Sequence, residues 1–287
     1  MDDMLILQWL KKTNEKYRKA DVPPRQRPMK AMLDFSVEFK VYVVLGSELA
    51  KKIDNFFESN SKPGEHSMGS LFTGCYYFDS TFWPLSIPSF FGEVSLSPFD
   101  YLDDMPDSLK IEIENDSELL NSLLFYWSDC LDYILGYETI LSSGSFEPKA
   151  LIFFKNAHRE LIGAISQILL PKPNTKVILS LRMAAEIFMK ACLVQELKLS
   201  DKELMKLSHK LEDIAAECYK TTKDEKYLLI SNDMSVFPSV SYRYDGGESK
   251  YSEIWKALCL TQKVASIFTR RYSPYNTLAQ LALSDNL

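Results

Sequence analysis

Three charged side chains stand at a spacing that could bind an anion. Arg182, Glu186 and Lys190 are four residues apart, so on a helix they share one face. Arginine and lysine are the usual protein cations for phosphate groups, and Arg243 could add a further contact. The same spacing also fits an ion-pair ladder on a helix surface, worth about 0.2–0.5 kcal/mol per pair. Both interpretations stay open: a polar strip lining a pocket or dimer seam, or an exposed ladder.

His209 completes the set of ligand-binding candidates. If one helix runs through Leu207 and Leu211, the imidazole lies opposite these leucines and faces solvent. If Ser208 instead caps the helix, His209 stands at the helix start and its direction is open. No complete catalytic motif accompanies it, so the catalytic residues are unknown and enzymatic activity stays uncertain, leaning towards none.

Motifs for other chemistries are missing. The three histidines are too far apart for a His-x-x-x-His metal site, and no two of the five cysteines form a Cys-x-x-Cys pair, which is the usual spacing of zinc and redox sites. Neither Gly-Lys-Ser/Thr nor Gly-x-Gly-x-x-Gly occurs, so the common phosphate-binding loops are absent. We therefore expect no metal, no cofactor and five reduced thiols.

Composition places the chain among ordinary globular proteins. It has 287 residues, 46% hydrophobic and 25% charged, with a net charge of −6. No signal peptide and no apolar run of about 20 residues is found, so we expect a cytoplasmic protein without membrane contact. The acidic balance disfavours a general nucleic-acid binder. The densest basic segments, Pro23–Pro28 and Thr269–Arg271, are interpreted as a solvated turn and a solvated helix end.

The first part of the chain mixes two kinds of pattern. Helices are expected over residues 4–19 and 48–59, the second capped by Ser47. Between them, residues 33–43 alternate apolar and polar, which is typical of a half-buried strand. Residues 61–106 are rich in glycine, proline and aromatic residues, which favours short strands and turns. Residues 1–115 are thus predicted to form an α+β module.

From residue 116 onward the apolar residues follow a helical period. Helices are predicted over about 117–143, 148–169, 175–197, 208–219 and 249–271, the first capped by Ser117 and closed by Gly144. Short connections between long amphipathic helices indicate an antiparallel bundle. Residues 116–287 are therefore predicted to form an all-α second domain.

Parts of this second domain resemble a known family. Leu181–Leu193, Ser208–Ile214 and Val240–Gly246 resemble the second core helix, the next helix and the loop before the last helix of HEPN domains. The resemblance covers about residues 148–270 and leaves residues 1–115 out. It implies a four- to five-helix bundle that dimerises, in a prokaryotic defence or toxin–antitoxin setting.

The chain departs from that family at one point. Its ribonuclease members carry an arginine followed by a histidine after four to six residues, and no histidine here has an arginine at that distance upstream. The resemblance therefore implies a non-catalytic sensor or interaction protein, a homodimer that binds a nucleotide, RNA or protein partner. Two alternatives remain: a divergent metal-independent ribonuclease or toxin with unusual spacing, and a structural adaptor without a small ligand.

Overall fold

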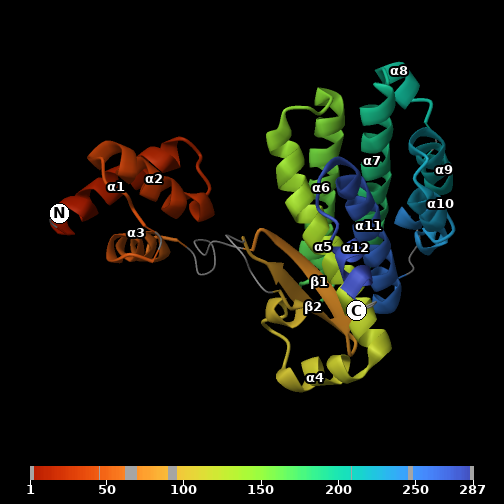
Figure 1. Ribbon diagram of the computed structural model, residues 1–287, viewed down its shortest axis with the longest axis horizontal. Helices are drawn as coiled ribbons and strands as arrows, with labels where there is room; N and C mark the ends of the chain where they lie inside the picture. Colours follow the sequence, from red (N-terminus) through yellow and green to blue (C-terminus); the bar gives the residue numbers. More distant parts are fainter. Residues whose placement is uncertain are drawn as a thin grey trace. The chain divides into compact units, whose positions relative to one another are not determined.

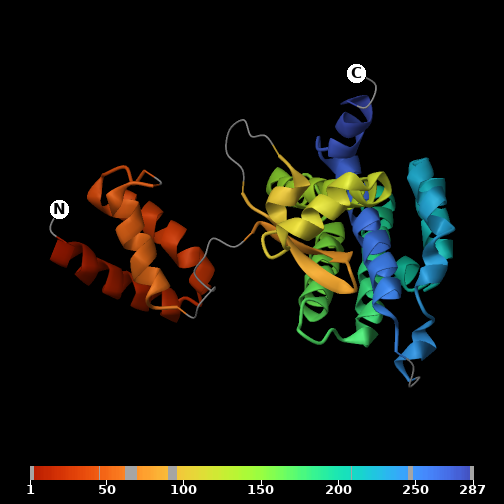
Figure 2. The same cartoon turned by 90° about the horizontal axis from the view of Figure 1, so that it is seen from below.

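The chain forms two compact units, Met1–Ser70 and Leu71–Leu287. A computed structural model describes residues 3–44, 46–61, 70–89, 96–207, 209–244 and 248–284. Each unit has a hydrophobic core of its own. Figures 1 and 2 show the helices of both units and the hairpin of the second.

The first unit consists of helices in its described part. These are α1 (Asp3–Lys19), the short η1 (Pro24–Gln26), α2 (Arg27–Phe39) and α3 (Glu48–Glu58). Their apolar faces meet in one core of fully or nearly fully buried side chains: Ile6, Leu10, Tyr17, Ala31, Met32, Phe35, Ala50, Ile53 and Phe57. As predicted, Ser47 caps α3, its hydroxyl accepting from the Ala50 amide at 3.2 Å.

The strand predicted over residues 33–43 is wrong, because most of this segment lies in α2. Ala31, Met32 and Phe35 are buried, which is helical spacing, while Leu33 and Val37 are 62% and 81% exposed. Tyr17 of α1 donates to Asp34 Oδ2 at 2.7 Å, which fixes α2 against its neighbour. The alternating pattern was misleading because exposed apolar residues fell between the buried ones.

A β-hairpin opens the second unit. Strands β1 (Phe72–Phe78) and β2 (Thr81–Ile87) pair antiparallel, with Phe78 opposite Thr81. Asp79 and Ser80 turn between them with positive φ angles of 48° and 60°, as a two-residue hairpin turn requires. The short strands predicted from turn residues and aromatic runs are therefore confirmed where the structure describes them.

The hairpin belongs to the helical unit rather than to an N-terminal module. Phe72, Cys75, Tyr76 and Leu85 are buried in the same core as the long helices, because β1 packs against α5, α6 and α11. The chain therefore divides at Ser70–Leu71, whereas the sequence placed the boundary between residues 115 and 116. The expected α+β module is corrected to a helical first unit and a hairpin that packs on the bundle.

Four long helices form the body of the second unit: α5 (Ser117–Ser143), α6 (Pro148–Ile168), α7 (Ile178–Leu197) and α11 (Tyr251–Tyr272). Helix α7 packs against α6 and α11, and α11 packs against α5. The pair α9 (Leu211–Thr222) and α10 (Glu225–Ser231) packs beside α7. The predicted helical bundle is confirmed. The shorter elements are η2 (Pro98–Tyr101), α4 (Asp107–Asn115), η3 (Thr175–Val177), α8 (Asp201–Leu204), η4 (Met234–Val236), η5 (Val240–Arg243) and α12 (Thr277–Ser284).

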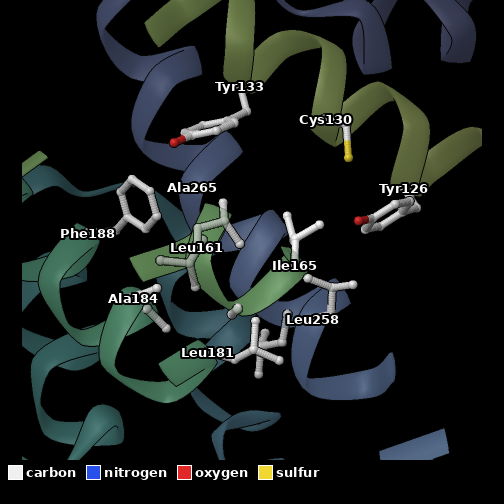
Figure 3. Close-up of a cluster of buried hydrophobic side chains, with 14 of the residues drawn as sticks. Tyr126, Cys130, Tyr133, Leu161, Ile165, Leu181, Ala184, Phe188, Leu258 and Ala265 are labelled. Carbon is white, nitrogen blue, oxygen red and sulfur yellow. The ribbon is translucent and has the colours of Figure 1, made fainter. Parts of the chain in front are cut away.

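The bundle core contains side chains from all four long helices. Figure 3 shows Tyr133 of α5, Leu161 of α6, Phe188 of α7 and Ala265 of α11 facing one another, each 0% exposed. Helix α5 ends at Ser143 and is closed, as predicted, by the C-cap residue Gly144 with a φ of 63°. It is capped by Asp116 rather than Ser117, since Asp116 Oδ1 accepts from the Glu118 and Leu119 amides at 2.9 and 3.1 Å.

Candidate functional site

The candidate residues of helix α7 meet at one carboxylate. Lys190 Nζ lies 2.7 Å from Glu186 Oε1, and Arg182 Nη1 lies 3.4 Å from Glu186 Oε2. The three side chains are only 10–13% exposed. They do not form the exposed ladder that the spacing also allowed, because the neighbouring α9 segment covers this face of α7. At low exposure, charges interact more strongly than they do at an open surface.

His209 joins the same carboxylate from the segment before α9. Its Nδ1 lies 2.8 Å from Glu186 Oε1, while the ring remains 77% exposed. Arg182 Nη2 donates to the His209 carbonyl at 2.6 Å, which ties this segment to α7. Helix α9 begins at Leu211, so His209 precedes the helix instead of lying on its far face.

The resulting Glu186 cluster consists of Arg182, Glu186, Lys190 and His209. One carboxylate thus faces two permanent cations and an imidazole, so basic groups are in excess. Next to it lies an open pocket of 410 Å³, whose lining includes Arg182, His209, Lys210 and Ser239. Such a pocket presents nitrogen donors to a ligand. Arg243 ends η5, and its side chain lies outside the described part of the structure.

A second polar cluster, between α5 and α11, was missed by the sequence analysis. Arg270 Nη1 lies 2.6 Å from Asp129 Oδ1, and Arg270 Nε lies 2.7 Å from Asp132 Oδ2. Their side chains are 5%, 12% and 0% exposed. The expectation that Thr269–Arg271 forms a solvated helix end is therefore wrong for Arg270. A signal was present, because Asp129 and Asp132 lie one turn apart on the apolar face of α5.

Hydrogen bonds complete this Arg270 cluster. Ser266 Oγ donates to Asp129 Oδ1 at 2.7 Å, and the Thr277 amide and hydroxyl donate to Asp132 Oδ1 at 2.8 and 2.6 Å. Burial raises the pKa of the Asp129 carboxyl, and Arg270 and Ser266 act in the opposite direction. Here two acids share one cation, the reverse of the Glu186 cluster.

The cysteine thiols, which could also be reactive, are mostly buried. All five cysteines are free, and four of them are buried. Burial raises the pKa of the Cys75, Cys130 and Cys259 thiols, which makes them poor nucleophiles. In the described ranges, no group of three or more His, Cys, Asp and Glu side chains is arranged to hold a metal ion.

Comparisons with known proteins give no family for this chain. No protein-family model, curated protein or solved structure matches it significantly. Among the described helices, none combines the length and the apolar character needed to cross a bilayer.

Proposed function

We propose that the second unit is a HEPN-type helical module that binds the phosphate of a nucleotide or RNA at the Glu186 cluster, as a homodimer and without catalysis. The observation that carries the proposal is the excess of basic groups around one carboxylate beside an open pocket. This clustering supports a binding site over a structural adaptor, for which scattered, exposed side chains are expected.

The geometry gives Arg182 the main role. Its guanidinium is held by Glu186 and by the His209 carbonyl, so little conformational entropy is lost when it binds a ligand. Arg182 lines the pocket together with His209, so a phosphate there meets the guanidinium, and the imidazole is a second donor only in its protonated form. Glu186 orients these donors, and Lys190 keeps the buried carboxylate neutralised from the other side.

A binding measurement on the full chain tests this proposal. Affinities for ATP and for a short single-stranded RNA are compared between wild type, Arg182→Ala and Lys220→Ala. Lys220 is the matched control, because it is a 73% exposed cation on α9 and does not line the pocket. Loss of a charged hydrogen bond should weaken binding about tenfold in Arg182→Ala, with little change in Lys220→Ala. Equal losses in the two variants would contradict a site at Arg182.

One observation favours the ribonuclease alternative. Glu186 holds His209 at Nδ1, which leaves Nε2 at the exposed edge of the ring, where a general base could accept the 2′-hydroxyl proton of RNA. Arg182 donates to the His209 carbonyl, so its guanidinium is close enough to this ring to stabilise the same phosphate. The binding module and the ribonuclease differ in one result: both bind RNA, and only the ribonuclease cleaves it.

Cleavage assays distinguish the two. We expect purified wild-type protein to leave single-stranded and structured RNA intact. If wild type cleaves, and His209→Ala or Arg182→Ala abolishes cleavage with folding unchanged, the ribonuclease replaces the binding module. Sedimentation equilibrium of the same wild-type sample tests the homodimer.

A further inference from the structure

A larger pocket lies on another part of the second unit. It has a volume of 930 Å³ and is bounded by α5, α10 and α11, with η4 and α12 at its margins. This volume is in the range of small-molecule sites, which is about 300–1,000 Å³. None of its lining residues belongs to the Glu186 cluster or to the pocket beside it.

The walls of this pocket are mainly apolar and aromatic. Tyr126 and Trp255 line it with their rings in edge contact, 4.8 Å between centroids. Phe125 of α5 and Leu229 of α10 also line it, and they are 56% and 62% exposed. Large apolar side chains that remain exposed around a concavity are typical of a ligand-binding surface.

The charges at this pocket favour an anion. Lys226, Lys256 and Lys263 line it and are exposed, and within the described residues none of them forms an ion pair. Asp233 is the acid on the same lining that is not already paired with Arg270. The second unit as a whole has 29 acidic and 21 basic residues and is therefore negatively charged. The three lysines make the rim of this pocket locally positive.

The buried Arg270 cluster supplies the second observation. Arg270 and Asp129 both line the pocket. Arg270 Nη2 is buried and has no hydrogen-bond partner among the described residues, although its side chain is only 5% exposed. An unpaired buried N–H group costs about 1–3 kcal/mol, and a ligand acceptor in the pocket would remove that cost.

We propose that this pocket binds a small amphipathic anion, a molecule with an aromatic or alkyl body and one carboxylate, sulfonate or phosphate. The body lies over Tyr126 and Trp255, between the exposed side chains of Phe125 and Leu229. The anionic group lies towards Lys256, Lys263 and Arg270, which follow one another at intervals of seven residues on α11. This site is independent of the phosphate site proposed at Arg182.

A matched pair of fluorescent probes tests the proposal on the full chain. 8-Anilinonaphthalene-1-sulfonate has the stated chemistry, and N-phenyl-1-naphthylamine is its neutral counterpart. We expect the sulfonate to bind at one site per chain and more tightly than the amine. The double variant Lys256→Ala/Lys263→Ala should weaken the sulfonate about tenfold and change the amine little. Equal affinity of the two probes for wild type, or equal losses in the double variant, would overturn the anionic specificity.

A second pair of variants locates the site. Leu229→Asp places a carboxylate in the pocket and should abolish binding of both probes. Leu228→Asp is the control, because Leu228 is 49% exposed on the same helix and does not line the pocket. Circular dichroism and thermal melts verify that both variants are folded. Identical binding by the two folded variants would overturn the location, as would a loss of sulfonate binding in Arg182→Ala.

Discussion

The two polar clusters of the second unit have opposite charge balance, and only one of them includes an exposed side chain, that of His209. Around Arg270, two carboxylates share one guanidinium, and all three side chains are at most 12% exposed. Around Glu186, one carboxylate holds Arg182, Lys190 and a histidine ring that is 77% exposed. The Arg270 cluster is buried and has one unpaired N–H group among the described residues, at Arg270 Nη2, whereas the Glu186 cluster reaches solvent through His209.

This difference assigns different tasks to similar residue types. A buried ion pair is stabilising only while every partner is present, since desolvation opposes the mutual attraction. The Arg270 cluster therefore holds α5, α11 and the start of α12 together, and it adds one unpaired N–H group to the neighbouring pocket. The Glu186 cluster contributes less to stability, and its extra basic groups are available to a ligand.

Paired arginine substitutions give the strongest test of this contrast. Arg270→Met removes the cation shared by Asp129 and Asp132 and should lower the free energy of unfolding by about 3–5 kcal/mol. Arg182→Met should lower it by about 1 kcal/mol, because Glu186 keeps Lys190 and His209. Urea denaturation followed by circular dichroism measures both. Similar losses in the two variants would remove the distinction between the clusters.

The pH dependence of the stability lost in Arg270→Met is the control for this test. Burial already raises the pKa of Asp129 above its ordinary value, and removal of the guanidinium raises it further. A carboxyl with a raised folded pKa stabilises the fold at low pH and loses this effect as the pH rises through that pKa. The deficit of Arg270→Met should therefore shrink as the pH falls from about 7 through the raised pKa of Asp129. A constant deficit would indicate lost packing rather than unpaired carboxylates.

The Glu186 cluster was partly predictable from sequence, whereas for the Arg270 cluster the sequence offered only the two acids Asp129 and Asp132 on the apolar face of α5 and no sign of their partner. Spacing along α7 brought Arg182, Glu186 and Lys190 to one face, because helix geometry is local. The contact of His209 with Glu186 depends on how the α9 segment packs, which no local pattern encodes. Arg270 looked like one of two exposed cations at a helix end, since its acidic partners are about 140 residues away.

The fold shows the same division between local and distant information. The long helices follow from the helical period of their apolar residues, and the start of α3 at Ser47 and the end of α5 at Gly144 follow from capping residues. These predictions were confirmed. Helix α2 was missed because Val37 and Leu33, though apolar, are exposed. The hairpin's association with the bundle depends on tertiary contacts of Phe72 and Tyr76. The domain boundary was therefore predicted after residue 115, although the second unit begins at Leu71.

The partly buried His158 tests the effect of burial on a group that forms no ion pair with the described residues. His158 Nδ1 lies 2.6 Å from the Tyr133 hydroxyl oxygen. Burial, with a smaller effect of Arg159, lowers the pKa of His158 from 6.5 to about 4. A histidine with a lowered folded pKa stabilises the fold above about pH 6.5, and this contribution is lost as the pH falls towards 4. The loss is on the order of 3 kcal/mol.

Stability curves measured across this pH range test the effect of His158. The free energy of unfolding of His158→Gln should vary less than that of wild type between about pH 6.5 and pH 4. Absolute stability at neutral pH is compared separately, because the substitution also alters the contact with Tyr133. Parallel curves for the two proteins would exclude His158 as the titrating group.

The smallest expected effects come from two glycines that differ in their surroundings. A Cβ on Gly136 of α5 would lie 2.6 Å from Thr269 Cβ and 2.9 Å from Ser273 Oγ, so Gly136→Ala must push α11 away. Overpacking costs about 1–3 kcal/mol, and the better helix propensity of alanine returns up to about 1 kcal/mol. We expect a net loss of about 1 kcal/mol, together with a weaker Arg270 cluster, because Asp132 lies one turn before Gly136.

Gly163 of α6 is the matched control for this close approach. A Cβ there meets nothing within 4 Å, so Gly163→Ala should stabilise the protein by about 0.5–1 kcal/mol. Thermal and urea unfolding of the two variants should therefore shift in opposite directions. The double variant Gly136→Ala/Arg270→Met should lose less than the two single losses added together, since both act on the α5–α11 contact. Additive losses would show that the close approach at Gly136 and the buried ion cluster are independent.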